Sequence, residues 1–118
     1  MFKFKMNDKD WIIYEDSQVN IQRILEAKGT TIEKGLRWYG ITCSDENKII
    51  LDKDLCFDRK RTTLIHELTH CYITSFITHQ EKSYDEEMVA DIVSNSLDII
   101  NAIVTKYFNK GGDNKKKK

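Results

Sequence analysis

The sequence predicts an α+β fold in a single domain. Its 118 residues amount to about one ordinary domain, and its 40% hydrophobic content is enough for a core. Strand-forming and helix-forming patterns occupy separate stretches of the chain, which is typical of this fold class. We expect residues 1–109 to form the domain and residues 110–118 to form a disordered basic tail.

The first expected element is a short helix of about three turns near the N-terminus. Either Asp16 or Ser17 can cap it, and Gly29 stands where a left-handed residue ends a helix. Its apolar residues recur at helical spacing and are Val19, Ile21, Ile24 and Leu25.

A β-hairpin is expected next. Residues 36–44 and 48–52 are rich in β-branched and aromatic side chains, and the turn-forming residues Asp45-Glu46-Asn47 separate them. We therefore expect a small mixed or antiparallel sheet that includes this hairpin.

Two longer helices follow. Residues 59–77 form the first, with Asp58 as its N-cap and an apolar stripe on one face. That stripe consists of Ile65, Leu68, Tyr72 and Phe76. The second helix begins at Asp85, continues with apolar residues at helical spacing and ends near Asn109.

Composition argues against several classes of partner. Basic and acidic residues number 19 each, but removing residues 111–118 leaves 15 basic and 18 acidic residues, a net charge of −3. Such a surface is poorly suited to nucleic acid. No run of apolar residues is long enough to span a membrane, and the N-terminus lacks the apolar region of a secretory signal. We expect a cytoplasmic protein whose three cysteines are reduced.

The chemically informative motif is His66-Glu67-Leu68-Thr69-His70, an HExxH pattern. Residues four apart lie on the same face of a helix, so both imidazoles can reach one metal ion. Glu67 can then act as general base on a water molecule. The pattern predicts a Zn²⁺ site within the 59–77 helix.

A catalytic zinc ion needs a third protein ligand, and the next helix offers one. Glu87 is the favoured ligand, with Glu86 and His79 as alternatives. Asp91 shares a helical face with Glu87, so it can accept the second N–H of a ligating histidine. Asp85, Glu86 and Glu87 could instead be ordinary favourable charges in the first turn of a helix.

The HELTH motif, followed by Glu87 and Asp91 on the next helix, resembles the gluzincin class of zinc metallopeptidases. The segment 36–93 looks most like the small ImmA/IrrE-type metallopeptidases of phages and mobile elements. The resemblance implies a minimal zincin-like domain with His66, His70 and Glu87 as zinc ligands. It also implies Glu67 as general base and Asp91 as a partner of a ligating histidine.

The expected function is therefore hydrolysis of a peptide bond in a specific intracellular protein by a zinc-dependent endopeptidase. An exposed strand of the hairpin would hold the substrate as an extended peptide. Tyr84 is the favoured donor to the developing oxyanion, with Tyr39 and Tyr72 as alternatives. The alternative function is a non-catalytic binding or inhibitory module of the same fold. The oligomeric state stays open.

Overall fold

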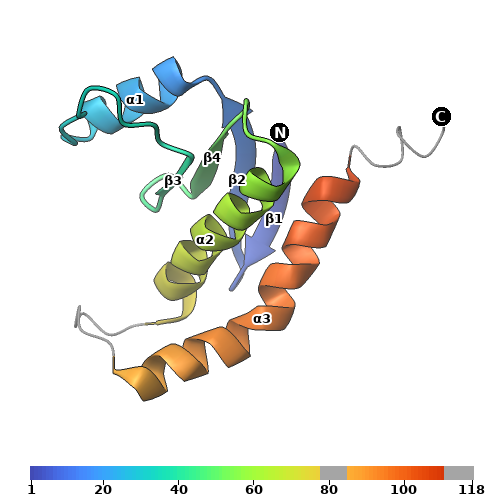
Figure 1. Cartoon of the computed structure of the whole chain (residues 1–118). Helices are drawn as coiled ribbons and strands as arrows, with labels where there is room; N and C mark the ends of the chain where they lie inside the picture. Colours follow the sequence, from blue (N-terminus) through green and yellow to red (C-terminus); the bar gives the residue numbers. More distant parts are fainter. Residues whose placement is uncertain (78–84, 111–118) are drawn as a thin grey trace, which may run out of the picture.

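Four strands form one mixed sheet in the order β1–β2–β4–β3 (Figure 1). The computed structural model describes residues 1–77 and 85–110. The strands are β1 (Phe2–Met6), β2 (Lys9–Asp16), β3 (Gly40–Cys43) and β4 (Lys48–Asp52). The central strands β2 and β4 are parallel, whereas β1 and β3 pair antiparallel with them. Within the described residues, β3 is therefore an edge strand with one side of its backbone unpaired.

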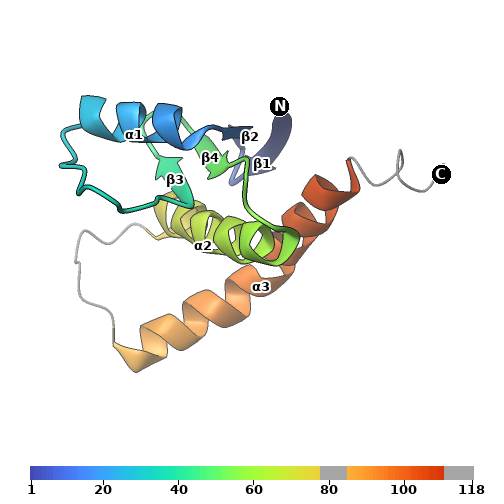
Figure 2. The same cartoon turned by 45° about the horizontal axis from the view of Figure 1, so that its top comes forward.

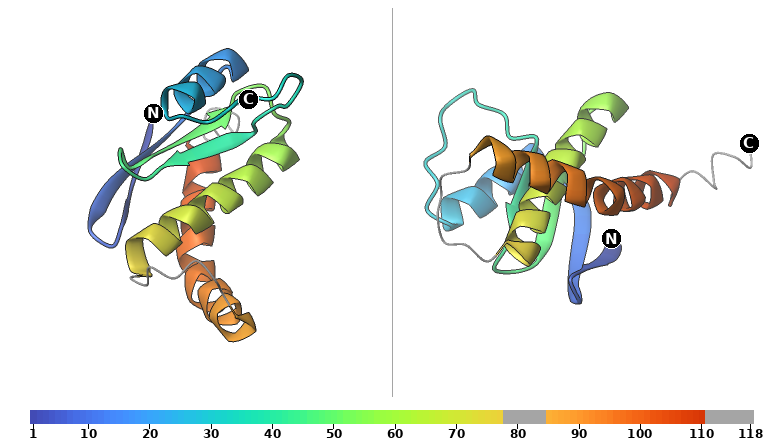
Figure 3. Two further views of the ribbon diagram at one scale, coloured as in Figure 1. Left: turned by 90° about the vertical axis from the view of Figure 1, so that its left-hand side faces the viewer. Right: turned by 90° about the horizontal axis from the view of Figure 1, so that it is seen from below.

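Three helices cover this sheet in layers. They are α1 (Gln18–Ala27), α2 (Phe57–Phe76) and α3 (Glu86–Asn109). The left view of Figure 3 shows α1 on one face of the sheet, α2 on the other, and α3 on the outer side of α2. The N-terminal half of α3 extends beyond the sheet, away from the chain's N-terminus (Figures 1 and 2).

Successive side chains of each strand point to opposite faces of the sheet, so a separate core forms on each face. In β4, Ile49 and Leu51 belong to the core beneath α2 and α3, whereas Ile50 belongs to the smaller core beneath α1. β3 follows the same rule, because Ile41 and Cys43 belong to the α1 core. Gly40 and Thr42 therefore lie on the face turned toward α2.

The α+β class and all three helices are confirmed. Ser17 caps α1, accepting a hydrogen bond from the Asn20 N–H at 3.2 Å, and Gly29 after its end has a φ of +91°. Asp85 caps α3 in the same way, through the Met88 N–H at 2.8 Å. The expected N-cap of α2 is wrong, because α2 begins two residues earlier and Cys56 holds the cap position. Asp58 lies instead in its first turn, where its charge favours the helix dipole.

Two features of the sheet differ from expectation. The β1–β2 hairpin was not predicted, and its two turn residues Asn7 and Asp8 have φ values of 51° and 64°. Such left-handed pairs are typical of two-residue hairpin turns. The 36–52 hairpin is confirmed, but β3 begins only at Gly40, so residues 36–39 are not part of the strand.

A polar cluster joins α2 and α3 to the sheet. Glu15 on β2 accepts a hydrogen bond from the Tyr107 hydroxyl at 2.5 Å and pairs with Lys60 at 2.7 Å. Burial raises the pKa of Glu15, but these hydrogen bonds outweigh burial and hold that pKa below its ordinary value. The cluster fixes the C-terminal half of α3, where Tyr107 is also buried.

Polar residues interrupt every apolar run of α3, but by overall length and composition α3 is the one helix in the described part of the chain that could cross a membrane. Core helices of soluble proteins pass the same test. All three cysteines are free, with Cys43 and Cys71 buried and Cys56 exposed. The expected basic tail lies outside the described residues except for Lys110.

Candidate metal centre

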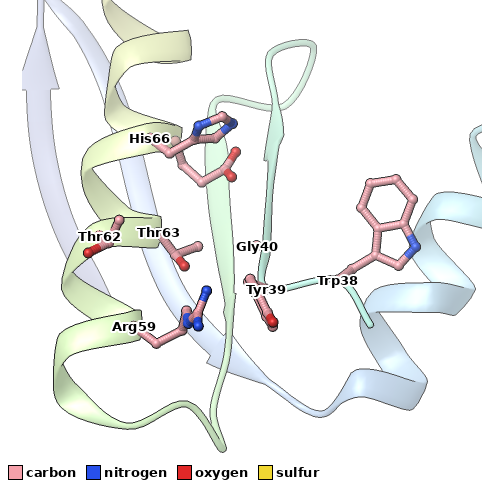
Figure 4. Close-up of a pocket in the computed structure, with 8 residues that line it drawn as sticks. Trp38, Tyr39, Gly40, Arg59, Thr62, Thr63 and His66 are labelled. Atoms are coloured by element: carbon pink, nitrogen blue, oxygen red, sulfur yellow. The ribbon is translucent and has the colours of Figure 1, made fainter. Parts of the chain in front are cut away.

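The two histidines of the HExxH motif lie together on α2. Both side chains are exposed, and their Nε2 atoms are 3.3 Å apart with the rings in an edge-on arrangement. Figure 4 shows His66 pointing into the space between α2 and the hairpin. The helical spacing of four residues thus brings both imidazoles to one point, as expected.

The distance between these nitrogens suits a zinc ion. Zinc binds imidazole nitrogen at about 2.0–2.1 Å, and two ligands of a tetrahedral ion at that length lie about 3.3 Å apart. His66 and His70 match this separation with their observed 3.3 Å. The separation is therefore compatible with two ligands of one tetrahedral metal ion, and it also lies within hydrogen-bonding distance.

No third ligand joins this pair among residues 1–77 and 85–110, where no three His, Cys, Asp or Glu side chains are grouped to hold a metal. Glu86 and Glu87 are exposed in the first turn of α3. Asp91 is also exposed and borders a different cavity, between the end of α2 and α3, together with Tyr72. His79 lies outside the described residues. The structure thus brings together two of the three expected ligands.

Glu67 lies beside the pair and is held by the edge strand. Its side chain is only 6% exposed, and its Oε1 accepts a hydrogen bond from the Thr42 hydroxyl at 2.7 Å. Thr42 points toward α2 because of the alternation along β3. The carboxylate is therefore fixed in orientation while it borders the same space as both histidines.

Gly40 allows β3 to lie this close to α2. A Cβ atom added to Gly40 would be 2.8 Å from the Thr63 Cγ2 atom and 3.3 Å from the Glu67 Cγ atom. Atoms at 2.8 Å overlap, so a larger residue would push the strand and helix apart. The absence of a side chain at residue 40 thus brings Thr42 within hydrogen-bonding distance of Glu67.

A groove runs between α2 and β3 on both sides of the motif. One cavity of about 340 Å³ lies toward the start of α2, and another of about 310 Å³ lies toward its end. Trp38, Gly40, His66 and Glu67 border both cavities, whereas His70 borders only the second. The groove thus passes directly over the histidines and the glutamate.

The groove wall before β3 is held in place by Gln18 on α1. The Gln18 amide donates to the Trp38 carbonyl at 2.8 Å and accepts from the Trp38 N–H at 2.7 Å. The same amide nitrogen donates to Asp52 at 2.8 Å. A side chain thus gives Trp38 the two hydrogen bonds that a neighbouring strand would give.

Asp52, at the end of β4, anchors this network. Its side chain is 1% exposed and accepts hydrogen bonds from Arg37, Gln18 and the Asp54 N–H. Burial raises the pKa of Asp52, but these donors together outweigh burial and hold it below its ordinary value. The ionised carboxylate therefore holds the loop that carries Trp38.

The tyrosines differ in their relation to the groove. Tyr39 borders the cavity next to His66, whereas Tyr72 is buried on the side of α2 that faces α3. Tyr84 lies outside the described residues. Cys71 is fully buried in the core, as expected from its position on α2.

Sequence reasoning missed Gly40, Thr42 and Gln18. The alternation of β3 was the signal for the first two, because it places every second residue against α2. The role of Gln18 leaves no local signal, since its partners are 20 and 34 residues away.

No protein-family model, curated protein or solved structure matches this chain. The resemblance to a metallopeptidase family therefore stays a prediction.

Proposed function

We propose that this chain is a zinc-dependent endopeptidase that cleaves a peptide bond in a specific intracellular protein. One observation carries the proposal: the Nε2 atoms of His66 and His70 are 3.3 Å apart in a groove that also contains the Glu67 carboxylate. An HExxH motif on a helix is the pattern of zinc peptidases. Membership of the small ImmA/IrrE-type metallopeptidases is part of this proposal.

His66 and His70 would supply two of the three protein ligands. Glu87, in the first turn of α3, is the proposed third ligand. Glu86 and His79 are the alternatives. Asp91, one turn after Glu87, is the proposed partner of a ligating histidine. A bound zinc ion supplies Lewis-acid polarisation of a water molecule and of the scissile carbonyl.

Glu67 performs the proton transfer in this proposal. It takes a proton from the attacking water and delivers it to the leaving amine, as a positioned general base and acid. Thr42 occupies Oε1 of Glu67, and Oε2 accepts no hydrogen bond from the described residues. That oxygen is therefore the one available to the water. Tyr39 joins Tyr84 as a candidate donor to the oxyanion because it borders the groove.

The substrate would bind as an extended peptide along the free edge of β3. An edge strand offers unpaired N–H and C=O groups to an added strand. The two cavities of about 340 and 310 Å³ are large enough for only a few side chains on either side of the motif. These dimensions favour a narrow range of protein substrates.

Metal analysis and cleavage test the proposal together. We expect about one zinc ion per chain in protein purified without chelator or metal-affinity resin. Glu67→Gln should retain the zinc but lower cleavage of a partner protein by about 10²- to 10⁴-fold, because the proton acceptor is lost. His66→Ala and His70→Ala should lose the metal.

Glu26→Gln on α1 is the matched control, because this glutamate is exposed and borders neither cavity of the groove. It should leave both zinc content and cleavage unchanged. Cleavage that survives Glu67→Gln would remove the general base from the proposal. Protein without metal in any preparation would remove the zinc centre.

A second function, a non-catalytic binding or inhibitory module, is favoured by one observation. The described residues supply two metal ligands and not three. Full biological effect after replacement of both histidines by alanine would support this module and contradict the peptidase.

A further inference from the structure

One end of the groove carries a positive charge that has no ion-pair partner among the residues that the structure describes. Arg59 borders the 340 Å³ cavity and reaches from α2 toward Tyr39 (Figure 4). It precedes His66 by seven residues, two helical turns, so both lie on the same face of α2. The rise of 1.5 Å per residue separates the two positions by about 10 Å along the helix.

The Arg59 guanidinium contacts an aromatic ring. Its central carbon lies 4.9 Å from the centre of the Tyr39 ring, within the range of a cation–π contact. Among residues 1–77 and 85–110, no carboxylate lies within ion-pair distance of Arg59. Stacking on an aromatic ring leaves the N–H groups at the edge of the guanidinium available to a ligand.

Arg37 provides a contrast in the same part of the groove wall. Its central carbon is 5.9 Å from the Tyr39 ring, but its Nε donates to the buried Asp52 at 2.8 Å. The charge of Arg37 is thus compensated within the protein. Within the described part of the chain, Arg59 has no such carboxylate partner beside its cavity, and residues 1–110 carry a net charge of −3.

We propose that this end of the groove is a subsite for a carboxylate on the bound peptide. Arginine binds carboxylates with two parallel hydrogen bonds, which favours a carboxylate over an amide or an ammonium group. A strand advances about 3.3 Å per residue, so 10 Å places the carboxylate about three residues from the cleaved bond. The distance from a cleaved bond rests on the proposed function, whereas the subsite itself requires only that the groove binds a peptide.

The carboxylate has two possible sources, an Asp or Glu side chain within the substrate or the C-terminus of the peptide chain. Both present the same pair of oxygens to Arg59. Peptides with amidated or free C-termini distinguish these sources in the experiment below.

The test measures peptide binding by fluorescence anisotropy in the Glu67→Gln background, where bound peptides are not cleaved. The probes are labelled ten-residue peptides with blocked ends, in which one Glu is moved through each position. A second set carries Gln at the same position, and a third leaves the C-terminus free. We expect one position, or the free C-terminus, to tighten binding by about 5- to 10-fold over the Gln or amidated peptide.

Arg59→Ala should abolish this preference, Arg59→Lys should retain part of it, and Arg59→Glu should reverse it, so that the Gln peptides bind more tightly than the Glu peptides. Arg61→Ala is the matched control on the same helix, since Arg61 is exposed and borders a different cavity with Phe57 and Phe108. It removes the same charge and should leave the preference intact.

Three results would overturn the subsite: an equal Glu preference in the Arg59→Ala protein, an equal loss in the Arg61→Ala protein, or no binding of any Glu or free-terminus peptide. The failure of the peptidase proposal is distinguishable from these. If zinc and cleavage are absent but the preference for a peptide carboxylate depends on Arg59, the subsite is supported and the peptidase proposal is contradicted.

Discussion

Residue 40 illustrates how a single position can determine the geometry of a whole site. Gly40 contributes no side chain, and the space where its Cβ would lie is already occupied by Thr63 and Glu67. The hydrogen bond from Thr42 to Glu67 depends on that close approach. The glycine therefore acts on the carboxylate indirectly, through the distance between β3 and α2.

We predict that Gly40→Ala destabilises the protein by about 1–3 kcal/mol, the usual cost of overpacking a well-filled region. The new methyl group would lie 2.8 Å from Thr63 Cγ2, so β3 must move away from α2. Urea unfolding measures the change in the free energy of unfolding.

Thr63→Ser, which removes the opposing methyl group, is the matched variant. The Gly40→Ala, Thr63→Ser double variant should recover part of the lost stability, because the clash is relieved. Equal stabilities of Gly40→Ala and the natural sequence would show that the strand and helix have more room than the contacts imply.

At the scale of elements, local patterns predicted the helices better than the strands. The periodic apolar residues and the caps Ser17 and Asp85 lie within each helix, so a helix can be recognised from its own residues. Segment 36–39 has a strand-like composition, but the backbone of its Trp38 is hydrogen-bonded by the Gln18 side chain and not by a strand. Gln18 is distant in sequence, so composition alone cannot distinguish segment 36–39 from a strand.

The N-terminal hairpin was missed for a different reason. Phe2, Phe4 and Met6 alternate with lysines, which is a strand pattern, and Asn7-Asp8 is a favourable turn. The same alternation of lysines also argues against a secretory signal, and that was the only meaning drawn from it. The strand signal was therefore present in the residues and was overlooked.

We predict that the network around Asp52 makes stability depend on acid pH. Its pKa in the folded protein lies below its ordinary value of 3.8, so the ionised form favours folding. This contribution is complete above the unfolded-state pKa and is lost as pH falls through the lower folded-state pKa. Urea unfolding between pH 7 and pH 2 would measure the free energy of unfolding across this range.

Asp52→Asn tests the assignment, because it keeps the shape of the side chain but removes its charge. At pH 7 it should cost about 1–3 kcal/mol, the typical loss on breaking hydrogen bonds to a charged group. The difference between the variant and the natural sequence should shrink as pH falls below 3.8. Asp54→Asn, at a neighbouring exposed position, is the control. A constant difference across the whole pH range would rule out Asp52 as the titrating group.

At the scale of the whole molecule, the candidate site depends on how α3 is placed relative to α2. The C-terminal half of α3 is held by Tyr107 and Glu15, whereas Glu87 is exposed at its far end. The histidine pair could be predicted because both residues lie within one helix. A third ligand on another helix could not be predicted from local spacing. Glu86 and Glu87 are adjacent and differ only in the side of α3 on which they lie.

We predict that zinc stabilises the chain against heat and that Glu87→Ala removes most of this effect. A ligand that binds only the folded state raises its stability with the logarithm of the ligand concentration divided by Kd, by about 2.7 kcal/mol at 100 times Kd. Loss of a ligand weakens zinc binding and so reduces the rise in Tm on adding zinc. Calorimetry with and without zinc measures both quantities.

Glu86→Ala and His79→Ala are the comparison variants. Each should retain the zinc-induced rise in Tm if Glu87 is the ligand. An undiminished rise in Glu87→Ala, with a loss in either comparison variant, would transfer the role to that residue.

The pairing of β3 with β4 has a further consequence for mutational tolerance. The four residues of β3 face two sides in strict alternation. Gly40 and Thr42 line the groove, whereas Ile41 and Cys43 belong to the core beneath α1. Sliding the strand by one residue would turn Ile41 and Cys43 toward the histidines and hide Gly40 and Thr42 under α1. An insertion or deletion within these four residues would therefore disrupt both the groove and the core beneath α1, whereas the neighbouring turn at 44–47 could change length without exchanging the two faces.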